Sequence, residues 1–235
     1  MQPTNKTARL AAVLYLASGL LAPFSLLYVP GKLIVCGNAA ATAQNIVQHE
    51  TLFRVAILFD LFSTIVLIFL AMVLYRLLNN VNRMQASLMV ILVLVSIPVS
   101  LFSIISEFAA LIVVRGPEYL SVFAKPQLDA LAMLFLQIRG RALLVAQIFW
   151  GLWLIPFGLL VMRSGFIPRI LGALLIINGF AYPAASLSSL LLPIGVGVLN
   201  PFLFVAELGE LWIMLWLLIK GAKVEPAPAP AVVAR

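Results

Sequence analysis

The sequence predicts an all-α integral membrane protein, a bundle of six transmembrane helices with both termini in the cytoplasm. Of its 235 residues, 64% are hydrophobic and only 10% are charged, whereas about 25% of the residues of a typical soluble domain are charged. The hydrophobic residues also gather in repeated stretches of about 20 residues, the length of helix that crosses a bilayer. The net charge of +7 lies at the ends of these stretches and forms no continuous stripe, so we expect no nucleic-acid partner.

The apolar stretches form one predicted domain, residues 1–223, whose main partner is the lipid bilayer. We expect its spans at residues 10–29, 52–78, 85–114, 141–162, 170–192 and 201–220. The first stretch is close to full membrane length and is followed by further spans, which favours an uncleaved helix over a signal peptide. The tail, residues 224–235, is rich in proline and alanine and is expected to be disordered.

Two connections between the spans carry local signals. Asn38 is expected to cap a short helix that begins at Ala39, because an asparagine side chain accepts hydrogen bonds from the first backbone N–H groups of a helix. Residues 128–136 are apolar but too few to span. We therefore predict an interfacial or re-entrant helix there.

The distribution of basic residues predicts the orientation. On the side of the two termini lie Lys6, Arg9, Arg76, Arg83, Arg163, Arg169, Lys220, Lys223 and Arg235, against Lys32, Arg54, Arg115, Lys125, Arg139 and Arg141 on the other side. The positive-inside rule places the richer side in the cytoplasm. We therefore expect a bacterial inner-membrane protein with cytoplasmic termini.

Four carboxylates interrupt the apolar stretches and are the candidate ligand-binding or proton-binding residues. Asp60, Glu107, Glu207 and Glu210 fall at a similar depth in the outer half of spans two, three and six. A charged side chain in the bilayer centre costs on the order of 3 kcal/mol, so these groups are expected to face protein or water. Glu207 and Glu210 are three residues apart, which puts them on one helical face.

Arginines and polar stripes are expected around these acids. Arg54, Arg139 and Arg141 lie at the outer ends of spans two and four and are the candidate charge partners. Polar residues recur three and four apart on spans three and five, and Tyr15, Ser18 and Ser25 lie three and seven apart on span one, as expected for helices that each turn one polar face inward. The candidate pocket-lining residues are Ser103, Asn178, Tyr182 and, in the outer loop, His49.

Several kinds of chemistry are excluded by what the sequence lacks. Cys36 is the only cysteine and His49 the only histidine, which rules out an internal disulfide and sites rich in thiolate or histidine ligands. We assign no cofactor, no metal ligand and no catalytic residue. A site for Mg²⁺, Mn²⁺ or Ca²⁺ made only of oxygen ligands stays open.

Two stretches close to the fourth and fifth spans carry a family resemblance. Residues 147–158 read QIFWGLWLIPFG and residues 163–172 read RSGFIPRILG. With residues 38–54 and 215–221, they resemble the bacterial membrane proteins of the domain-of-unknown-function 4386 family. Members of that family often carry a histidine where Arg139 stands, so no shared histidine chemistry is carried over. The resemblance implies the fold and a membrane location, and no activity.

The acidic constellation indicates a binding function. We expect an outward-facing intramembrane pocket that binds a cation or a small amine-bearing or lipid-like ligand, with transport of that ligand as a further step. Two alternatives stay open. One is an intramembrane lipid-modifying enzyme, with a carboxylate base and an arginine that holds phosphate. The other is a structural or sensory subunit whose loop, residues 115–140, docks a partner, with the buried acids and arginines paired in a structural network. The sequence leaves open whether the chain is an enzyme and whether it forms a homo-oligomer.

Overall fold

The computed structural model describes residues 5–191 and 200–222, with the side chains of the last helix described from Gly209 onward. The described residues are folded into helices joined by short connections, which confirms the predicted all-α fold. In chain order these are α1 (Asn5–Pro23), the π-helical turn η1 (Phe24–Tyr28), α2 (Val29–Leu33), α3 (Ala39–Gln48), α4 (Glu50–Leu78), α5 (Arg83–Arg115), the 3₁₀ turn η2 (Glu118–Leu120), α6 (Lys125–Leu152), α7 (Leu154–Ser164), α8 (Arg169–Leu191) and α9 (Asn200–Ile219).

Five segments in the described part of the chain are long and apolar enough to cross a membrane. They are Asn5–Leu33, Glu50–Leu78, Arg83–Arg115, Lys125–Ser164 and Arg169–Leu191. Helix α9 is also apolar, but its fully described part is the shorter helix Gly209–Ile219. The chain therefore has the helices of a membrane-embedded protein. The predicted disordered tail, residues 224–235, lies outside the described residues.

The predicted short interfacial helix is wrong. Residues 128–136 are instead the beginning of α6, which continues with α7 as a run of 40 residues, about 60 Å of helix. The short helix is not separate because its apolar residues pack against neighbours: Ala132 and Leu136 are buried, and this end of α6 contacts α5 and α3. The interruption comes later, at Trp153. Pro156 has no N–H to donate to the carbonyl of Leu152, which weakens the helix there.

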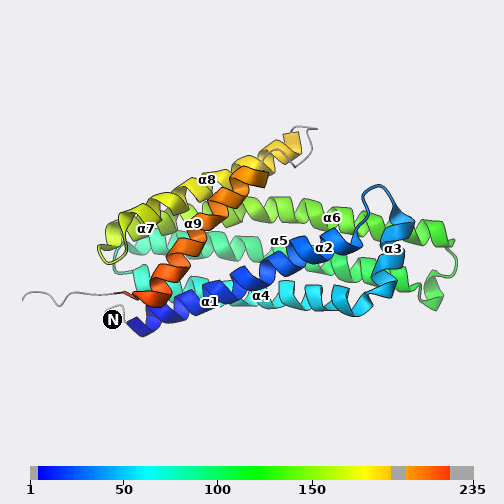
Figure 1. The fold of residues 1–235 in the computed structure, drawn as a ribbon, viewed down its shortest axis with the longest axis horizontal. Helices are drawn as coiled ribbons and strands as arrows, with labels where there is room; N and C mark the ends of the chain where they lie inside the picture. The colour runs from blue at the N-terminus through cyan, green and yellow to red at the C-terminus, as the bar shows by residue number, and fades with distance from the viewer. Residues whose placement is uncertain (1–4, 192–199, 223–235) are drawn as a thin grey trace, which may run out of the picture.

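The long helices run side by side, and the two ends of the bundle differ (Figure 1). Helix α3 lies across one end, near the start of α6, while the start of α1 and the end of α9 lie at the opposite end. The Asn38 side chain caps α3 as predicted, by accepting a hydrogen bond of 2.9 Å from the backbone N–H of Ala41. Helices α8 and α9 are inclined to the other long helices (Figure 1).

Glycines let α8 approach α6 and α7 closely. A Cβ atom placed on Gly158 would lie 2.5 Å from the carbonyl oxygen of Gly172, and one on Gly179 would lie 2.6 Å from Ile155 Cγ1. A Cβ on Gly151 would collide with Pro183. These contacts are the close packing expected of small residues in membrane helices. They fix the position of α8 along α6 and α7.

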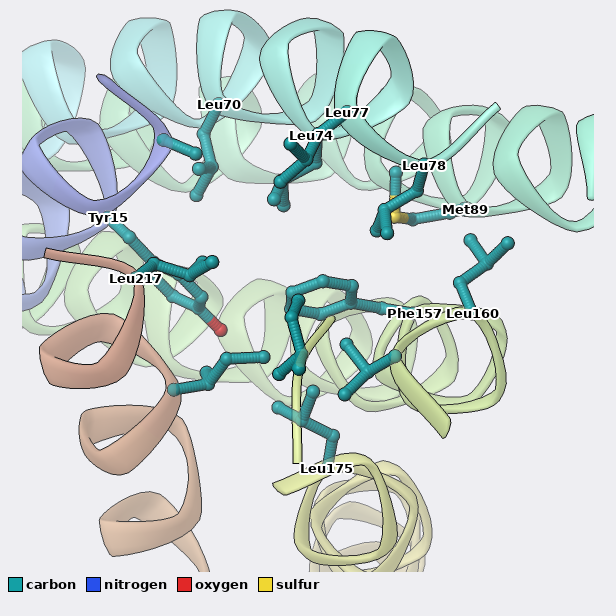
Figure 2. Packing of buried hydrophobic residues seen from close by; sticks show 14 of the residues in the cluster. Tyr15, Leu70, Leu74, Leu77, Leu78, Met89, Phe157, Leu160, Leu175 and Leu217 are labelled. Atoms are coloured by element: carbon teal, nitrogen blue, oxygen red, sulfur yellow. The ribbon is translucent and has the colours of Figure 1, made fainter. Parts of the chain in front are cut away.

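Two separate apolar cores form inside the bundle. The first joins α1, α9 and α7 to the end of α4 and the start of α5, and Figure 2 shows Leu70, Leu74 and Leu77 of α4 directed at Phe157 and Leu217. The second lies toward α3 and includes Val29, Leu33, Ile46, Phe53, Ile57, Ile104, Leu111 and Leu136. Between the two cores, the inward faces of α1, α4, α5 and α6 carry the polar residues described next.

Candidate functional site

Arg139 is the centre of a buried ion cluster between the two cores. Its Nη2 lies 3.3 Å from Asp60 Oδ2 on α4, and its Nε forms an ion pair with Glu107 Oε1 on α5. Arg139, Glu107 and Asp60 are 5%, 2% and 9% exposed. In such a setting, partners in contact offset the large cost of removing each charge from water. One guanidinium thus joins α4, α5 and α6 and faces two carboxylates.

The π-helical turn in the first span adds a fourth element to this cluster. The N–H of Val29 bonds to the carbonyl of Phe24, five residues back instead of four, and Pro30 has no N–H. The carbonyl of Ser25 therefore receives no hydrogen bond from Val29, the residue four positions on, or from Pro30, the residue five positions on. Arg139 Nη2 donates to this carbonyl at 3.2 Å, and the Ser25 hydroxyl donates to Asp60 Oδ1. The local irregularity of the helix thus creates an acceptor for the arginine.

The face of α5 toward this cluster is polar over three turns. Ser96, Ser100, Ser103 and Glu107 are all buried, at 0–5% exposure, as the spacing of four, three and four residues predicts. The hydroxyl of Ser100 donates to the carbonyl of Ser96 at 3.1 Å, so it needs no other partner. Glu107 Oε2 is buried and has no hydrogen-bond partner among the described residues. The cluster can therefore accept one further donor at this oxygen.

A second polar contact connects α1 to α9. The Tyr15 hydroxyl donates to Glu210 Oε2, a hydrogen bond of the strong charge-assisted type when the carboxylate is ionised. The Tyr15 ring lies 6.0 Å from the ring of Trp153, centroid to centroid. Tyr15 itself is only 4% exposed. Glu210 is therefore positioned by a buried aromatic residue and not left on the outer surface of the bundle.

A cavity of about 510 Å³ extends from Glu210 to Asp60, within the range of 300–1,000 Å³ typical of small-molecule sites. Aromatic side chains stand near the Glu210 end, and Trp150 Nε1 is buried there without a hydrogen-bond partner among the described residues. Hydroxyl and amide groups form the remaining polar surface. The polar and aromatic lining residues are Tyr15, Ser18, Asp60, Ser63, Thr64, Ser100, Ser103, Gln147, Trp150, Trp153, Tyr182 and Glu210.

The structure brings together some of the predicted site residues. Asp60, Glu107 and Arg139 are in direct contact, while Asp60 and Glu210 lie at the wall of one cavity with Ser103 and Tyr182. The side chain of Glu207 lies outside the described residues. Asp60 of α4 and Glu107 of α5 thus share an arginine, and Glu210 of α9 is paired separately with Tyr15.

The other predicted residues lie elsewhere. Arg54 pairs with Glu50 at 2.7 Å near the α3 end of the bundle, and both side chains are partly exposed. Arg141 is exposed, in a shallow apolar groove between α5 and α6. His49 is exposed between α3 and α4. Asn178 is buried, but on the α9 side of α8, where its amide nitrogen is close to Gly209.

Sequence reasoning did not select several residues that shape the site. Tyr15 and Ser25 stood out as polar positions of the first span but were not named as candidates, although they hold the two carboxylates. Gln147, Trp150 and Trp153 also line the cavity. They lie in the stretch that carried the family resemblance, which gave no indication of a site, and tryptophan in a membrane helix is ordinarily a packing or interface residue. Within the described residues, no group of three or more His, Cys, Asp or Glu side chains is placed to hold a metal ion.

Comparison with known proteins identifies a family and no activity. Residues 10–221 match the model of a family described as Domain of unknown function (DUF4386), and the resemblance seen in residues 147–172 is thereby confirmed. The match extends from Leu10, within α1, to Gly221, just after the end of α9. No curated protein and no solved structure matches the chain.

Proposed function

We propose that this chain, which belongs to the DUF4386 family, binds a small cationic molecule, a protonated amine, in the cavity between its two apolar cores. The single observation that carries this proposal is the lining of the cavity, which combines Glu210 and Asp60 with four aromatic side chains. A carboxylate attracts an ammonium group, and aromatic faces bind cations once water is excluded. Transport of the ligand across the membrane is the further step that this binding would serve.

The topology belongs to the same proposal. We place α9 as a sixth span, both termini in the cytoplasm and the protein in a bacterial inner membrane. Support comes from the basic residues Arg76, Arg83, Arg163 and Arg169, which lie at one end of the described helices, the end opposite α3. This is the distribution that the positive-inside rule associates with the cytoplasmic face.

Glu210 is the better candidate for the cation than Asp60. Asp60 already accepts from Ser25 through one oxygen and pairs with Arg139 through the other, so a ligand would have to displace one of them. Glu210 lies beside Tyr15 in the wall of the cavity and is only half-buried. We therefore assign Glu210 to the ligand, and Asp60 and Glu107 to holding Arg139.

The ion cluster favours a second candidate function, a structural subunit. A network that joins four elements through Arg139 serves to fix their packing even if nothing binds in the cavity. The lipid-modifying enzyme has weaker support, because Arg139 is already held by two carboxylates and is not placed to hold a phosphate group. The two remaining functions differ in the role of Glu210: it binds the ligand in the first, and it holds Tyr15 without binding a ligand in the second.

Thermal unfolding of the purified protein in a neutral detergent distinguishes them. Butylamine and octylamine, titrated at constant ionic strength, are expected to raise the unfolding temperature; a ligand at 100 times its Kd adds about 2.7 kcal/mol when it binds only the folded state. Glu210→Gln should abolish the stabilisation, and Glu118→Gln, an exposed carboxylate in the loop after α5, should preserve it. If neither amine stabilises the protein and Glu210→Gln merely lowers its stability, the binding function is wrong and the structural one stands.

A further inference from the structure

Along the axis of the bundle, the cavity lies between the two apolar cores. Toward α3 it is followed by the second apolar core, in which Val29, Phe53, Ile57 and Leu111 are 1–4% exposed. In the other direction lies the first core, and Figure 2 shows Tyr15 at its edge with Leu217 packed beside it. A hydrated cation would have to cross one of these cores to reach Glu210. Removing it from water without a polar path is costly.

The side of the cavity is different. Part of its wall is made of leucines that also face outward: Leu20 and Leu27 in the first span are 72% and 69% exposed, and Leu211 on α9 is 39% exposed. Between Leu20 and Leu27 the first span presents Ala22, Pro23 and Leu26 to the cavity. In a membrane, such outward-facing leucines contact lipid tails. As far as the described residues define it, the cavity therefore opens sideways, between the first span and α9.

The polar end of the cavity lies next to this opening. Glu210 is the residue directly before Leu211, and its partner Tyr15 is about one turn before Gly19 on α1. A charged group bound at Glu210 would thus have the outward-facing Leu211 on one side and the aromatic wall of Trp150 and Trp153 on the other. This juxtaposition of a carboxylate with an apolar exit suits a molecule that has one charged end and one long apolar end.

We propose that the ligand is a single-chain amphiphile with a protonated amine, which enters from the bilayer between the first span and α9. Its ammonium group binds Glu210, and its chain passes Leu20 and Leu211 into the lipid. This inference rests on the proposed function, because it names the ligand class of the same site. It replaces the outward-facing mouth expected from the sequence with a lateral one.

The length of the alkyl chain provides the first test. Binding to protein in lipid nanodiscs is followed through tryptophan fluorescence, with butylamine, octylamine and dodecylamine compared at known free aqueous concentrations. A chain that remains in an apolar phase gains about fourfold in affinity for each CH₂, so affinity should rise steeply along the series. A chain that lies in water while the ammonium group is bound makes no such gain, so affinity would stay flat along the series. Dodecanol, which lacks the charge, should not bind.

Variants at the opening provide the second test. Leu20→Trp and Leu211→Trp place a large ring at the lateral opening and should each weaken dodecylamine binding about tenfold. Because each variant adds a fluorophore, binding to the variants and to the wild type is compared by titration calorimetry. Butylamine binding, measured where it is detectable, should change less. Leu10→Trp is the matched control, because Leu10 is a 50% exposed leucine of α1 that does not line the cavity. The Leu10→Trp protein should bind dodecylamine with the affinity of the wild type.

The outcomes separate the two proposals. If all amines bind, but affinity is flat or falls with chain length and the tryptophan variants bind normally, the lateral route is overturned and the binding of a cation at Glu210 survives. If dodecanol binds as well as dodecylamine, the site is apolar and both proposals fail. If no amine changes the fluorescence of wild-type protein, the proposed function fails and takes the lateral route with it.

Discussion

Replacing Arg139 by methionine is expected to destabilise the protein more than any other single change near the site. Methionine has a similar length but no charge and no donor. The change would leave Asp60 and Glu107 buried at 9% and 2% exposure without the guanidinium that lies between them. It would also remove the donor to the carbonyl of Ser25, which has no backbone donor of its own.

The magnitude follows from this geometry. Removing one partner of a buried ion pair costs about 3–5 kcal/mol, because the remaining charge is uncompensated. For a chain of 150–250 residues, 1 kcal/mol corresponds to a shift of about 2–4 °C in unfolding temperature. Arg139→Met should therefore lower that temperature by about 6–20 °C. Arg139→Lys should be intermediate, since a single ammonium group cannot reproduce the fork that reaches both carboxylates.

The assay is thermal unfolding in detergent, followed by near-ultraviolet circular dichroism and by loss of monodisperse protein. Arg141→Met is the matched control. Arg141 is two residues away on the same helix but is exposed, so its replacement should change stability by no more than about 0.5 kcal/mol. Adding Asp60→Asn and Glu107→Gln to Arg139→Met should recover much of the loss, because the buried site then carries no net charge.

Two results would refute the reasoning. If Arg139→Met unfolds within 2 °C of wild type, taken as roughly 1 kcal/mol or less, the ion cluster does not hold the bundle together. If the triple variant is less stable than Arg139→Met, the carboxylates are stabilised by something other than Arg139. Either result would also remove the structural function considered above as the alternative to ligand binding.

Two further predictions concern packing and topology. Gly158→Ala should lower the free energy of unfolding by about 1–3 kcal/mol because its Cβ would meet the carbonyl of Gly172, whereas Gly140→Ala, with nothing within 4 Å of its Cβ, should raise it by about 0.5–1 kcal/mol; equal effects in thermal unfolding would contradict the close contact of α7 and α8. Cys36, the only cysteine and exposed, should react with a membrane-impermeant maleimide on intact cells, whereas Asn80→Cys in a Cys36→Ala background should react only after the membrane is opened; the reverse pattern would invert the proposed topology.

The sequence was informative wherever the relevant property is local. Span lengths depend on counting apolar residues, so the ends of α4, at Glu50 and Leu78, agree with the predicted 52–78 within two residues. The polar stripe of α5 follows from helical geometry alone, and all four of its residues are buried. The cap at Asn38 depends on a side chain and a backbone N–H three residues apart. None of these features needs knowledge of a distant part of the chain.

Helical continuity was harder to predict. Residues 128–136 are too few for a span. Gly140 lies between Arg139 and Arg141, at the point where the predicted fourth span begins. In the structure the helix passes through this point without interruption. The reason is tertiary: one face of the extension packs against α5 and α3, and that burial outweighs the modest cost of one glycine, about 1 kcal/mol.

The sequence by itself determined that this chain is a membrane-embedded helical protein with carboxylates inside its apolar helices. Only the tertiary structure decided which arginine meets two of them, Asp60 and Glu107. Arg139 and Arg141 are two residues apart, so on a helix they point about 200° away from each other, and only one can face the interior. Which one does so depends on the rotation of α6 against α4 and α5. That rotation is set by contacts between residues far apart in the chain, such as Arg139 with Asp60 and with the freed carbonyl of Ser25.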